Sequence, residues 1–401
     1  MLEIKPILST LLRHKSSSLL TILQIAITFA VVVNSISIIN QRIERMNRDT
    51  GMIESQILAL NVNPIGEDYD QEFNFKADVE LVRGIPGVID AVVVNQVPLS
   101  GSGDSSGVAA SQEQVDNLES IGTGFFRGDN HFVNTLGLNI ISGRNFNDDE
   151  VIYTDVMKNP NVVLITQSLA DKLFPDGNAL DSTVYFWSLK SKVIGIVDKM
   201  AGPWVQSSRF EDNLIQPIIS LSRFSRMIVR VEESQLQSVL GTIEKTLLDR
   251  NPNRVITGVR SLEEIKQRSY SGDNAMTMIL WIVIVLLIVV TALGIVGLVS
   301  FNVRQRIKQI GTRRALGATK ADIVRYFVTE NILITAMGIT FGTIITISLN
   351  IYLVKTFELA PLQWLYIPVG IVVMFLTGII AVWLPAKRAS SVSPAVATQT
   401  I

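Results

Sequence analysis

The sequence predicts an α-helical membrane domain of four transmembrane helices with a large inserted α/β extracytoplasmic domain. Of the 401 residues, 48% are hydrophobic and only 18% are charged, whereas an ordinary soluble protein has about 25% charged residues. The apolar residues gather in uncharged runs, each longer than the roughly 20 residues that a membrane-spanning helix needs, at 16–41, 275–303, 331–354 and 359–386. The long segment between the first two runs has the composition of a soluble domain.

We expect the spans at residues 16–41, 275–303, 329–354 and 367–386. The first run could instead be a signal peptide, but it is longer than the 7–15 apolar residues of such a signal and no small-residue cleavage site follows it, so a retained anchor is favoured. It is also the most polar run, with Gln24, Thr28 and Asn34 inside it. Polar side chains in a span usually face other helices, so this span is expected to pack inside an assembly.

Basic residues predict the orientation, because cytoplasmic loops are enriched in Lys and Arg. They precede the first run, crowd the loop 304–328 and follow the last run, whereas the short loop 355–366 contains only one. Both termini and the 304–328 loop are therefore predicted to be cytoplasmic, and residues 42–274 and 355–366 to be outside. Residues 1–15 read as an amphipathic helix on the cytoplasmic membrane face, and residues 387–401 as a cytoplasmic tail.

The segment 42–274 reads as a mixed α/β domain. A helix, a Gly-Ile-Pro-Gly turn and a β-branched strand are predicted within 77–101, and a strand followed by a helix at 161–174. Two strands with a tight connection are predicted at 185–200, one strand at 226–231, and an amphipathic helix within 234–255. These elements suggest strand–helix–strand halves at 42–100 and 215–274, with a β-rich insert at 101–214. Residues 101–120, rich in Gly, Ser, Gln and Asp, are expected to form a flexible loop.

Catalytic and metal sites are not indicated. The chain has no cysteine and only two histidines, far apart in sequence, which argues against thiolate and histidine metal clusters. Asp148, Asp149 and Glu150 could bind a cation, but a solvated, helix-starting turn is the favoured interpretation. His131 is interpreted as structural or exposed, because no sequence feature supplies a partner.

The dipeptide Gly-Lys does not occur, so the chain has no phosphate-binding P-loop. No cofactor is expected on this chain, and ATP with its Mg²⁺ would be bound by another subunit.

The segment 304–330, RQRIKQIGTRRALGATKADIVRYFVTE, is basic and helix-prone. Ile307 and Ile310 recur at helical spacing, and Ala315 with Leu316 forms a small apolar knob among basic residues. Such a surface can dock in the groove of a partner through its apolar face, with arginines at the rim. The alternative interpretation is a loop whose arginines only fix the topology.

The order of residues in this loop closely resembles the signature of FtsX-like permeases of the MacB/LolC/LolE type, the mechanotransmission class of ABC transporters. The matching positions are Ile310, Gly311, Arg313, Arg314, Ala315, Leu316, Gly317, Ala318, Asp322, Ile323 and Glu330. Gln309 stands where the family usually has an acid. The segments 132–150 and 162–200 resemble the MacB-type periplasmic core domain, and the tail resembles that of the family through Pro385, Ala386, Ala389, Pro394 and Ala397.

The resemblance implies a dimer with a second copy or a related permease, driven by a separate ABC ATPase subunit of the MacB/LolD type. The loop 304–328 would sit on that ATPase as a coupling helix, through Ile310, Gly311, Arg313, Arg314, Ala315, Leu316, Gly317 and Ala318. Extended helices at about 40–56 and 262–275 would carry motion to the external domain. The resemblance also suggests a bacterial inner membrane, contact with membrane lipid, a periplasmic membrane-fusion adaptor as an optional partner, and no nucleic acid.

Three residues of the third span have two interpretations each. Gly338 and Gly342 form a G-x-x-x-G pattern, which indicates either close helix packing or the general tolerance of membrane helices for glycine. Glu330, at the membrane boundary, would either pair with an arginine of the loop or reach the water at the interface.

The leading functional hypothesis is the permease subunit of an ABC transporter that exports peptide, drug or lipid-linked cargo. The alternatives are an FtsX-like transducer that controls a cell-wall hydrolase outside the membrane, and release of lipoproteins as in LolC and LolE. The external domain is larger than that of FtsX-type transducers, which argues against the first alternative. A membrane-anchored enzyme is disfavoured because no catalytic constellation is evident.

Overall fold

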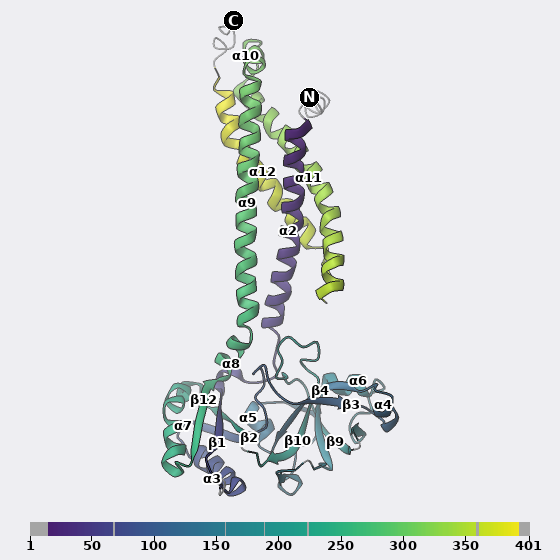
Figure 1. The fold of residues 1–401 in the computed structure, drawn as a ribbon, viewed down its shortest axis with the longest axis vertical. Helices are drawn as coiled ribbons and strands as arrows, with labels where there is room; N and C mark the ends of the chain where they lie inside the picture. The colour runs from purple at the N-terminus through teal and green to yellow at the C-terminus, as the bar shows by residue number, and fades with distance from the viewer. Residues whose placement is uncertain are drawn as a thin grey trace. The chain divides into compact units, whose positions relative to one another are not determined.

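The computed structural model describes residues 15–66, 69–156, 158–187, 189–222, 224–357 and 361–392 (Figure 1). The chain divides into two compact units, which are described separately. The helical unit comprises residues 1–44 and 273–401, and the α/β unit comprises residues 45–272. The predicted N-terminal amphipathic helix falls almost entirely outside the described residues, as do Pro394 and Ala397 of the tail.

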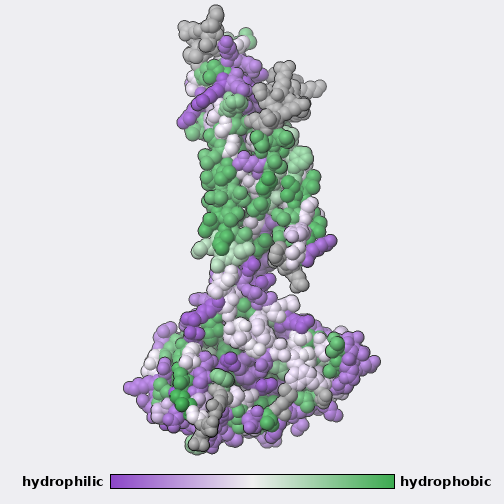
Figure 2. All heavy atoms as spheres, viewed as in Figure 1, coloured by the Kyte–Doolittle hydropathy of each residue, from purple (hydrophilic) through white to green (hydrophobic). Residues whose placement is uncertain are grey.

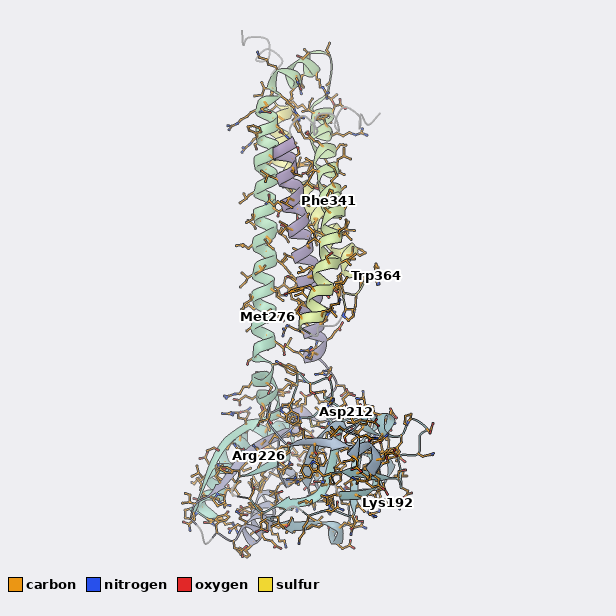
Figure 3. The ribbon with its side chains drawn as sticks, turned by 45° about the vertical axis from the view of Figure 1, so that its right-hand side comes forward. Lys192, Asp212, Arg226, Met276, Phe341 and Trp364 are labelled. Atoms are coloured by element: carbon orange, nitrogen blue, oxygen red, sulfur yellow. The ribbon has the colours of Figure 1, made fainter. Side chains whose placement is uncertain are left out.

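The helical unit contains α2 (Lys15–Met46), α9 (Ser271–Gln305), α10 (Ile307–Ala315), α11 (Lys320–Phe357) and α12 (Tyr366–Ser390). All of these except α10 are long and apolar enough to cross a membrane. Their outward surface is largely hydrophobic (Figure 2), with exposed side chains such as Met276 on α9 and Phe341 on α11 (Figure 3). This surface is what lipid-facing helices require.

Helix α2 is the most enclosed of the four long helices. Its most apolar window is 61% buried, against 28–33% for the other three. Thr28 shares a hydrogen bond of 2.8 Å with Thr291 of α9, and the Asn34 side-chain amide donates to the carbonyl of Thr346 on α11 at 3.3 Å. These polar residues of the first span therefore face helices of the same chain, as polar side chains within a span usually do.

Gly338 and Gly342 lie where α11 meets α2. A Cβ atom on Gly338 would come within 2.5 Å of Ile25 Cγ2, and one on Gly342 within 3.0 Å of the carbonyl oxygen of Ala26. Real Cβ atoms do not approach their neighbours so closely as 2.5 Å. Of the two interpretations of this glycine pair, the structure therefore supports close helix packing.

Three helix boundaries differ from those predicted. Helix α2 ends at Met46, so the expected extension to residue 56 is wrong: residues 47–53 are irregular and a short 3₁₀ turn, η1 (Glu54–Gln56), precedes the first strand. The predicted extension at 262–275 is divided at Tyr270 into α8 (Leu262–Ser269) and the start of α9. Helix α11 begins at Lys320, well inside the segment predicted as the loop 304–328.

The first sheet of the α/β unit has the strand order β12-β1-β11-β2 and is antiparallel throughout. Its strands are β1 (Ile57–Pro64), β2 (Val88–Val94), β11 (Ser225–Val231) and β12 (Arg254–Ser261). Helices α3 (Gln71–Arg83) and α7 (Leu236–Arg250) pack together on one face, where apolar residues of both helices and of the strands form a single core. The sequences β1–α3–β2 and β11–α7–β12 are the strand–helix–strand halves that the sequence predicted.

The second sheet has eight strands and is mixed parallel and antiparallel. Six of them follow the order β3-β4-β10-β7-β9-β5, and the other two, β6 and β8, pair with β10 and β9. Its strands are β3 (Ser105–Val108), β4 (Ile121–Gly128), β5 (Ile140–Gly143), β6 (Ile152–Thr154), β7 (Val162–Thr166), β8 (Thr183–Phe186), β9 (Leu189–Val197) and β10 (Asn213–Ser220). Short helices accompany them: α4 (Gln112–Asp116), α5 (Phe132–Leu136) and α6 (Gln167–Leu173). The opposite face of the first sheet shares a core with this region, through residues such as Ala59, Val92 and Phe132.

The prediction of a flexible loop at 101–120 is wrong, because this segment contains strand β3 and helix α4. The sequence is polar there because β3 is short and partly exposed, and Ser111 caps α4 by accepting a hydrogen bond from the Gln114 backbone N–H. The boundary of the insert also differs: β10 runs to Ser220 within the eight-stranded sheet, so the second half starts after that residue and not at 215.

The acidic run at 148–150 forms a one-turn 3₁₀ helix, η2 (Asp148–Glu150). The backbone N–H of Asn147 donates to Glu150 in a capping box, and Arg144 forms a two-pronged ion pair with Glu150 at 2.6 and 2.7 Å. These contacts support the helix-starting turn that the sequence favoured over a cation site.

Candidate functional site

Helix α10 and the turn that joins it to α11 form the candidate site. At α10, Ile310 and Gly311 are buried, and Ile310 lies in one core cluster with Ile323 and Phe327 of α11 and Ala386 of α12. The apolar side of α10 therefore packs on helices of its own chain. This differs from the expectation that the apolar face would dock in a partner, because Ile310 packs within its own chain.

The turn after α10 is closed by a Schellman motif. The N–H of Ala318 donates to the carbonyl of Arg313 at 3.0 Å, and the N–H of Gly317 donates to the carbonyl of Arg314 at 3.2 Å. Gly317 has φ +98, a left-handed conformation that favours glycine. This pattern satisfies carbonyls that the end of α10 would otherwise leave without partners.

A polar cap starts α11 directly after this turn. The carboxylate of Asp322 accepts hydrogen bonds from the backbone N–H and the hydroxyl of Thr319, at 2.9 and 2.6 Å, and the Asp322 N–H donates back to the Thr319 hydroxyl at 3.2 Å. Both ends of the connection 316–319 are thus fixed by local hydrogen bonds. The matching Asp322 of the family signature is therefore a helix cap.

Three arginines attach this region to the rest of the helical unit. Arg306 forms an ion pair of 3.1 Å with Glu330, and both side chains are buried. The Arg313 guanidinium lies 4.9 Å from the centre of the Tyr326 ring, and Arg314 donates to the carbonyl of Ser390 on α12 at 3.0 Å. Of the two interpretations of Glu330, the structure supports pairing with an arginine of the loop.

The exposed part of the site is small. Leu316 is 83% exposed, and Ala315 and Gly317 beside it are also exposed. Ala318 is half-buried. Arg313 is exposed to solvent, although its guanidinium contacts the ring of Tyr326. A large apolar side chain held in water by a rigid turn is unfavourable unless something covers it. The site therefore presents one apolar tip, Leu316, on a scaffold fixed by hydrogen bonds and an ion pair.

Sequence reasoning did not identify several of the positions that fix this tip. Tyr326, Ser390 and Thr319 were not singled out, and Arg306 was considered only as one of many loop charges. Ser390 lies 76 residues from Arg314, and Arg306 lies 24 residues from Glu330, so no local pattern joins these pairs. Thr319 lies only three residues before Asp322, and this spacing was a local signal for the helix cap. A further buried ion pair, between Arg42 near the end of α2 and Asp273 at the start of α9, was also missed. A lone acid at the start of a long apolar run was the one available signal for it.

The candidates for catalysis gain no support. His131 contacts the buried carboxylate of Asp90 at 3.0 Å, a partner that the sequence did not indicate, and this contact fits the structural interpretation of His131. Asn134 and Arg83 also donate to Asp90, which makes this a structural link between β2 and the neighbouring helices. Burial acts to raise the pKa of the Asp90 carboxyl, but hydrogen bonds from Asn134 and His131 outweigh it and hold that pKa below its usual value. Among the described residues, no three His, Asp or Glu side chains are grouped so that they could hold a metal ion.

Two protein-family models match the chain. The model of the MacB-like periplasmic core domain covers residues 18–245, and the model of the FtsX-like permease C-terminal region covers residues 281–394. The fold and these matches define the class: the chain is a membrane protein with an extracytoplasmic α/β domain and FtsX-like membrane helices. It belongs to the ABC transporter permeases of the MacB/FtsX type.

Similar curated proteins include one named as a permease and one named as both ATP-binding and permease. An uncharacterized ABC transporter permease, YknZ, of Bacillus subtilis strain 168 is 24% identical over 98% of this chain and 97% of its own length. The macrolide export ATP-binding/permease protein MacB of Chromobacterium violaceum is 23% identical over 68% of this chain. The match covers only 42% of that MacB protein.

Solved structures with some likeness include the periplasmic region of MacB from Actinobacillus actinomycetemcomitans, with a TM-score of 0.34 and 15% identity over 52% of this chain and 91% of that one. The extracellular domain of YknZ from Gram-positive bacteria has a TM-score of 0.32 and 14% identity over 50% of this chain and all of that domain.

Proposed function

We propose that this chain is the transmembrane subunit of an ABC exporter, and that it transmits ATP-driven motion from a separate nucleotide-binding subunit to its own external α/β unit. The chain would act as a dimer with a second copy or a related permease. The cargo would be a peptide, a drug or a lipid-linked molecule. ATP and Mg²⁺ would be bound by the ATPase subunit, because no P-loop occurs in these 401 residues.

The observation that carries this proposal is the fixed, exposed tip at Leu316. A partner that pushes on a flexible loop loses the motion in the loop, whereas a tip fixed by the Schellman turn and the Arg306–Glu330 ion pair passes it to α9 and α11. Leu316 would insert in a groove of the ATPase, with Ala315 and Gly317 allowing close approach and Arg313 at the rim. Ile310, Gly311 and Arg314 would support the tip from inside.

The direction of the helices supports the same assignment. Helix α9 has 35 residues, and the α/β unit precedes its N-terminus while α10 follows its C-terminus. At about 1.5 Å per residue such a helix is about 50 Å long, enough to cross a membrane. Basic residues cluster around α10, so we place α10 and both termini in the cytoplasm and the α/β unit outside, in the inner membrane of a Gram-negative cell or its equivalent.

The names of relatives support a division between an ATP-binding portion and a permease portion. The MacB protein of Chromobacterium violaceum is named as both ATP-binding and permease, and this chain matches less than half of it. We infer that the unmatched part of such proteins includes the ATP-binding portion, and that this chain obtains the same activity from a partner. A periplasmic adaptor would be an additional partner outside the membrane.

The proposal is tested by purifying the full-length chain together with the ABC ATPase encoded beside its gene. Replacing Arg313, Arg314 and Leu316 together is expected to abolish both the complex and the stimulation of ATPase activity. Because Arg314 also contacts Ser390 inside the chain, the sharper variant is Leu316→Ser. It is expected to weaken binding of the ATPase by about tenfold or more, as loss of an apolar interface anchor typically does.

Leu118→Ser is the matched control, because Leu118 is likewise an exposed leucine in a turn but belongs to the α/β unit. It should bind and stimulate the ATPase as the wild type does. Equal complex formation and equal ATPase stimulation for wild type and Leu316→Ser would overturn the assignment of the tip. A gene for a membrane-fusion adaptor beside this one would favour export, whereas one for a cell-wall hydrolase would favour the signalling alternative.

A further inference from the structure

A cavity of about 570 Å³ lies in the α/β unit, at the place where the chain leaves the eight-stranded sheet along β10 and enters the four-stranded sheet along β11. Its volume is within the range of about 300–1,000 Å³ typical of small-molecule sites. Arg127 of β4 and Gln216 of β10 are register partners on its wall. Arg226 of β11 lines it from the other sheet (Figure 3).

An aromatic residue in an unfavourable conformation lines this cavity. Trp187 directly follows β8, whose last residue, Phe186, pairs with Leu189 at the start of β9. Its φ is 54, a left-handed value that is normally adopted by Gly, Asn or Asp. The side chain is 53% exposed, so burial within the fold does not explain the tryptophan. Backbone strain of this kind concentrates at functional sites.

A second exposed ring, from a different turn, lines the same cavity. Phe224 lies between β10 and β11 and is 77% exposed. Its backbone carbonyl accepts a hydrogen bond of 3.1 Å from the Ser222 hydroxyl, so the turn itself is ordered by polar contacts that do not need a phenylalanine. Two large aromatic side chains left in water at one cavity gain free energy when a flat apolar molecule covers them.

The described lining of the cavity has three basic residues, Arg127, Lys158 and Arg226, against two acidic ones, Asp104 and Asp155, so basic groups are in excess. Arg226 donates to the carbonyl of Asn95, and among the described residues no carboxylate lies within ion-pair distance of Arg226 or of Lys158, which also lines the cavity. Arg127 has only a loose ion pair of 3.5 Å with the exposed Asp104. A guanidinium without a carboxylate partner binds an acidic group strongly.

A buried amide adds a donor. Gln216 is 4% exposed, and its side-chain oxygen accepts a hydrogen bond of 3.3 Å from Nε of Arg127. Within the described part of the chain, its side-chain nitrogen has no acceptor. This nitrogen is not among the side-chain atoms that are shut off from solvent, so it can donate to a carbonyl or hydroxyl oxygen of a ligand in the cavity.

We propose that this cavity binds organic anions that combine a flat apolar ring system with one acidic group. The ring system covers Trp187 and Phe224, the acidic group accepts hydrogen bonds from Arg226, and the amide of Gln216 donates to a polar oxygen of the ring system. That such a molecule is cargo of the exporter rests on the proposed function, whereas its binding to the α/β unit does not.

The experiment compares three fluorescent probes on the full-length chain in lipid nanodiscs, with empty nanodiscs as the background. Dansylglycine, dansylamide and dansylcadaverine share one ring system and carry a negative charge, no charge and a positive charge at neutral pH. We expect dansylglycine to bind about tenfold more tightly than dansylamide, since a charge-assisted pair with arginine adds about that much. Dansylcadaverine should bind most weakly. Equal affinities for the three probes would overturn the proposal.

Variants locate the binding and separate its two parts. Arg226→Gln should remove the preference for dansylglycine over dansylamide, and Trp187→Gly should weaken both by about tenfold. Glycine suits the φ of residue 187, so this variant is expected to fold at least as well as the wild type. Arg209→Gln and Leu118→Gly are the matched controls, because Arg209 is an exposed arginine away from this cavity and Leu118 is an exposed residue with φ 60.

If the controls weaken binding as much as the cavity variants, the probes bind elsewhere and the proposal fails. If decanoate displaces dansylglycine at lower concentration than naphthalene-2-sulfonate does, the assignment of a flat ring system is wrong. These measurements need no ATPase, so their failure leaves the role of Leu316 intact. Conversely, the result for Leu316→Ser in the ATPase measurements does not affect the cavity, which is tested by probe binding alone.

Discussion

The helical unit and the α/β unit bury their charges in different places. In the helical unit the described ion pairs, Arg42–Asp273 and Arg306–Glu330, lie near opposite ends of α9. Between them, the helices are joined by neutral groups such as Thr28 and Thr291, and by glycines. In the α/β unit, buried carboxylates lie among helices and strands: Asp78 contacts Arg250 and Arg254, and Asp212 contacts Lys172 at 2.6 Å.

The difference follows from the solvent around each unit. A charge in the middle of a hydrocarbon layer is costly even when it is paired, so a spanning bundle places ion pairs where the membrane ends. A domain surrounded by water can surround a buried carboxylate with arginines and backbone groups. The comparison predicts that removing a charge lowers stability most inside the α/β unit. Loss of the ion pair at the end of the bundle should affect coupling to the ATPase. Where the spanning helices pack on one another, steric changes should have the largest effect.

The largest effect is expected at Asp78. Asp78→Ala leaves Arg254 fully buried without its carboxylate, which should lower the free energy of unfolding by about 3–5 kcal/mol. Glu80→Ala is the control on the same helix. The Glu80 side chain is exposed in its ion pair with Arg83, so this pair should contribute only about 0–1 kcal/mol to stability. Thermal unfolding of the full-length chain in one detergent measures both. Similar losses for the two variants would contradict the comparison.

The next effect is expected at the bundle end. Glu330→Ala leaves Arg306 buried without a carboxylate and should cost about 3 kcal/mol. The double variant Arg306→Met with Glu330→Met removes both charges and should recover most of this loss. Its stimulation of the ATPase is the second measurement: a recovered stability with reduced stimulation would indicate that the ion pair transmits force, whereas unchanged stimulation would limit it to stability.

A smaller effect is expected between the spans. Gly338→Ala places a Cβ within 2.5 Å of Ile25 and should destabilise the packing of α2 on α11 by about 1–3 kcal/mol. Gly297→Ala is the matched control on α9, where a Cβ meets nothing within 4 Å, so it should be neutral or slightly stabilising. Comparison of melting temperatures of the two variants decides the point, and equal values would remove the argument for close packing at this glycine.

The smallest effect is a pH dependence of the α/β unit. Although burial acts to raise the pKa of Asp90, hydrogen bonds from Asn134 and His131 leave it below the unfolded value of about 3.9. The stabilisation is therefore complete above that value and is lost as the pH falls through the folded pKa. Asp90→Asn should lower stability at pH 7 and show a shallower loss below about pH 4 than the wild type. Parallel acid-unfolding curves for the two proteins would contradict this.

Asp129 should act in the opposite direction within the same region. Burial raises the pKa of its carboxyl, although a backbone hydrogen bond from His131 opposes the shift. A raised carboxyl pKa gives a stabilisation that is present at low pH and lost as the pH rises through the folded pKa. Asp129→Asn should therefore steepen the acid loss slightly, which separates its contribution from that of Asp90 in the same unfolding measurement.

The sequence by itself determined the features that depend on neighbouring residues. Four apolar runs predicted the four long helices, and alternating and helical patterns predicted β2, β11 and α7, because burial of a regular face imposes a repeat on the sequence. The segment 304–330 was predicted to be basic and helix-prone with an apolar knob at Ala315 and Leu316, but the left-handed turn at Gly317 that separates α10 from α11 was not predicted. Polar composition misled at 101–120, where a short, partly exposed strand looks like a loop.

Only the tertiary structure decided which members of a motif face inward. Ile310 and Leu316 are neighbours in one signature, but Ile310 packs on α11 and α12 while Leu316 is exposed. The partners of Glu330 and Arg314 lie 24 and 76 residues away, and the cavity beside Arg226 joins residues of two sheets. Such contacts depend on how distant segments pack, and no local periodicity records them.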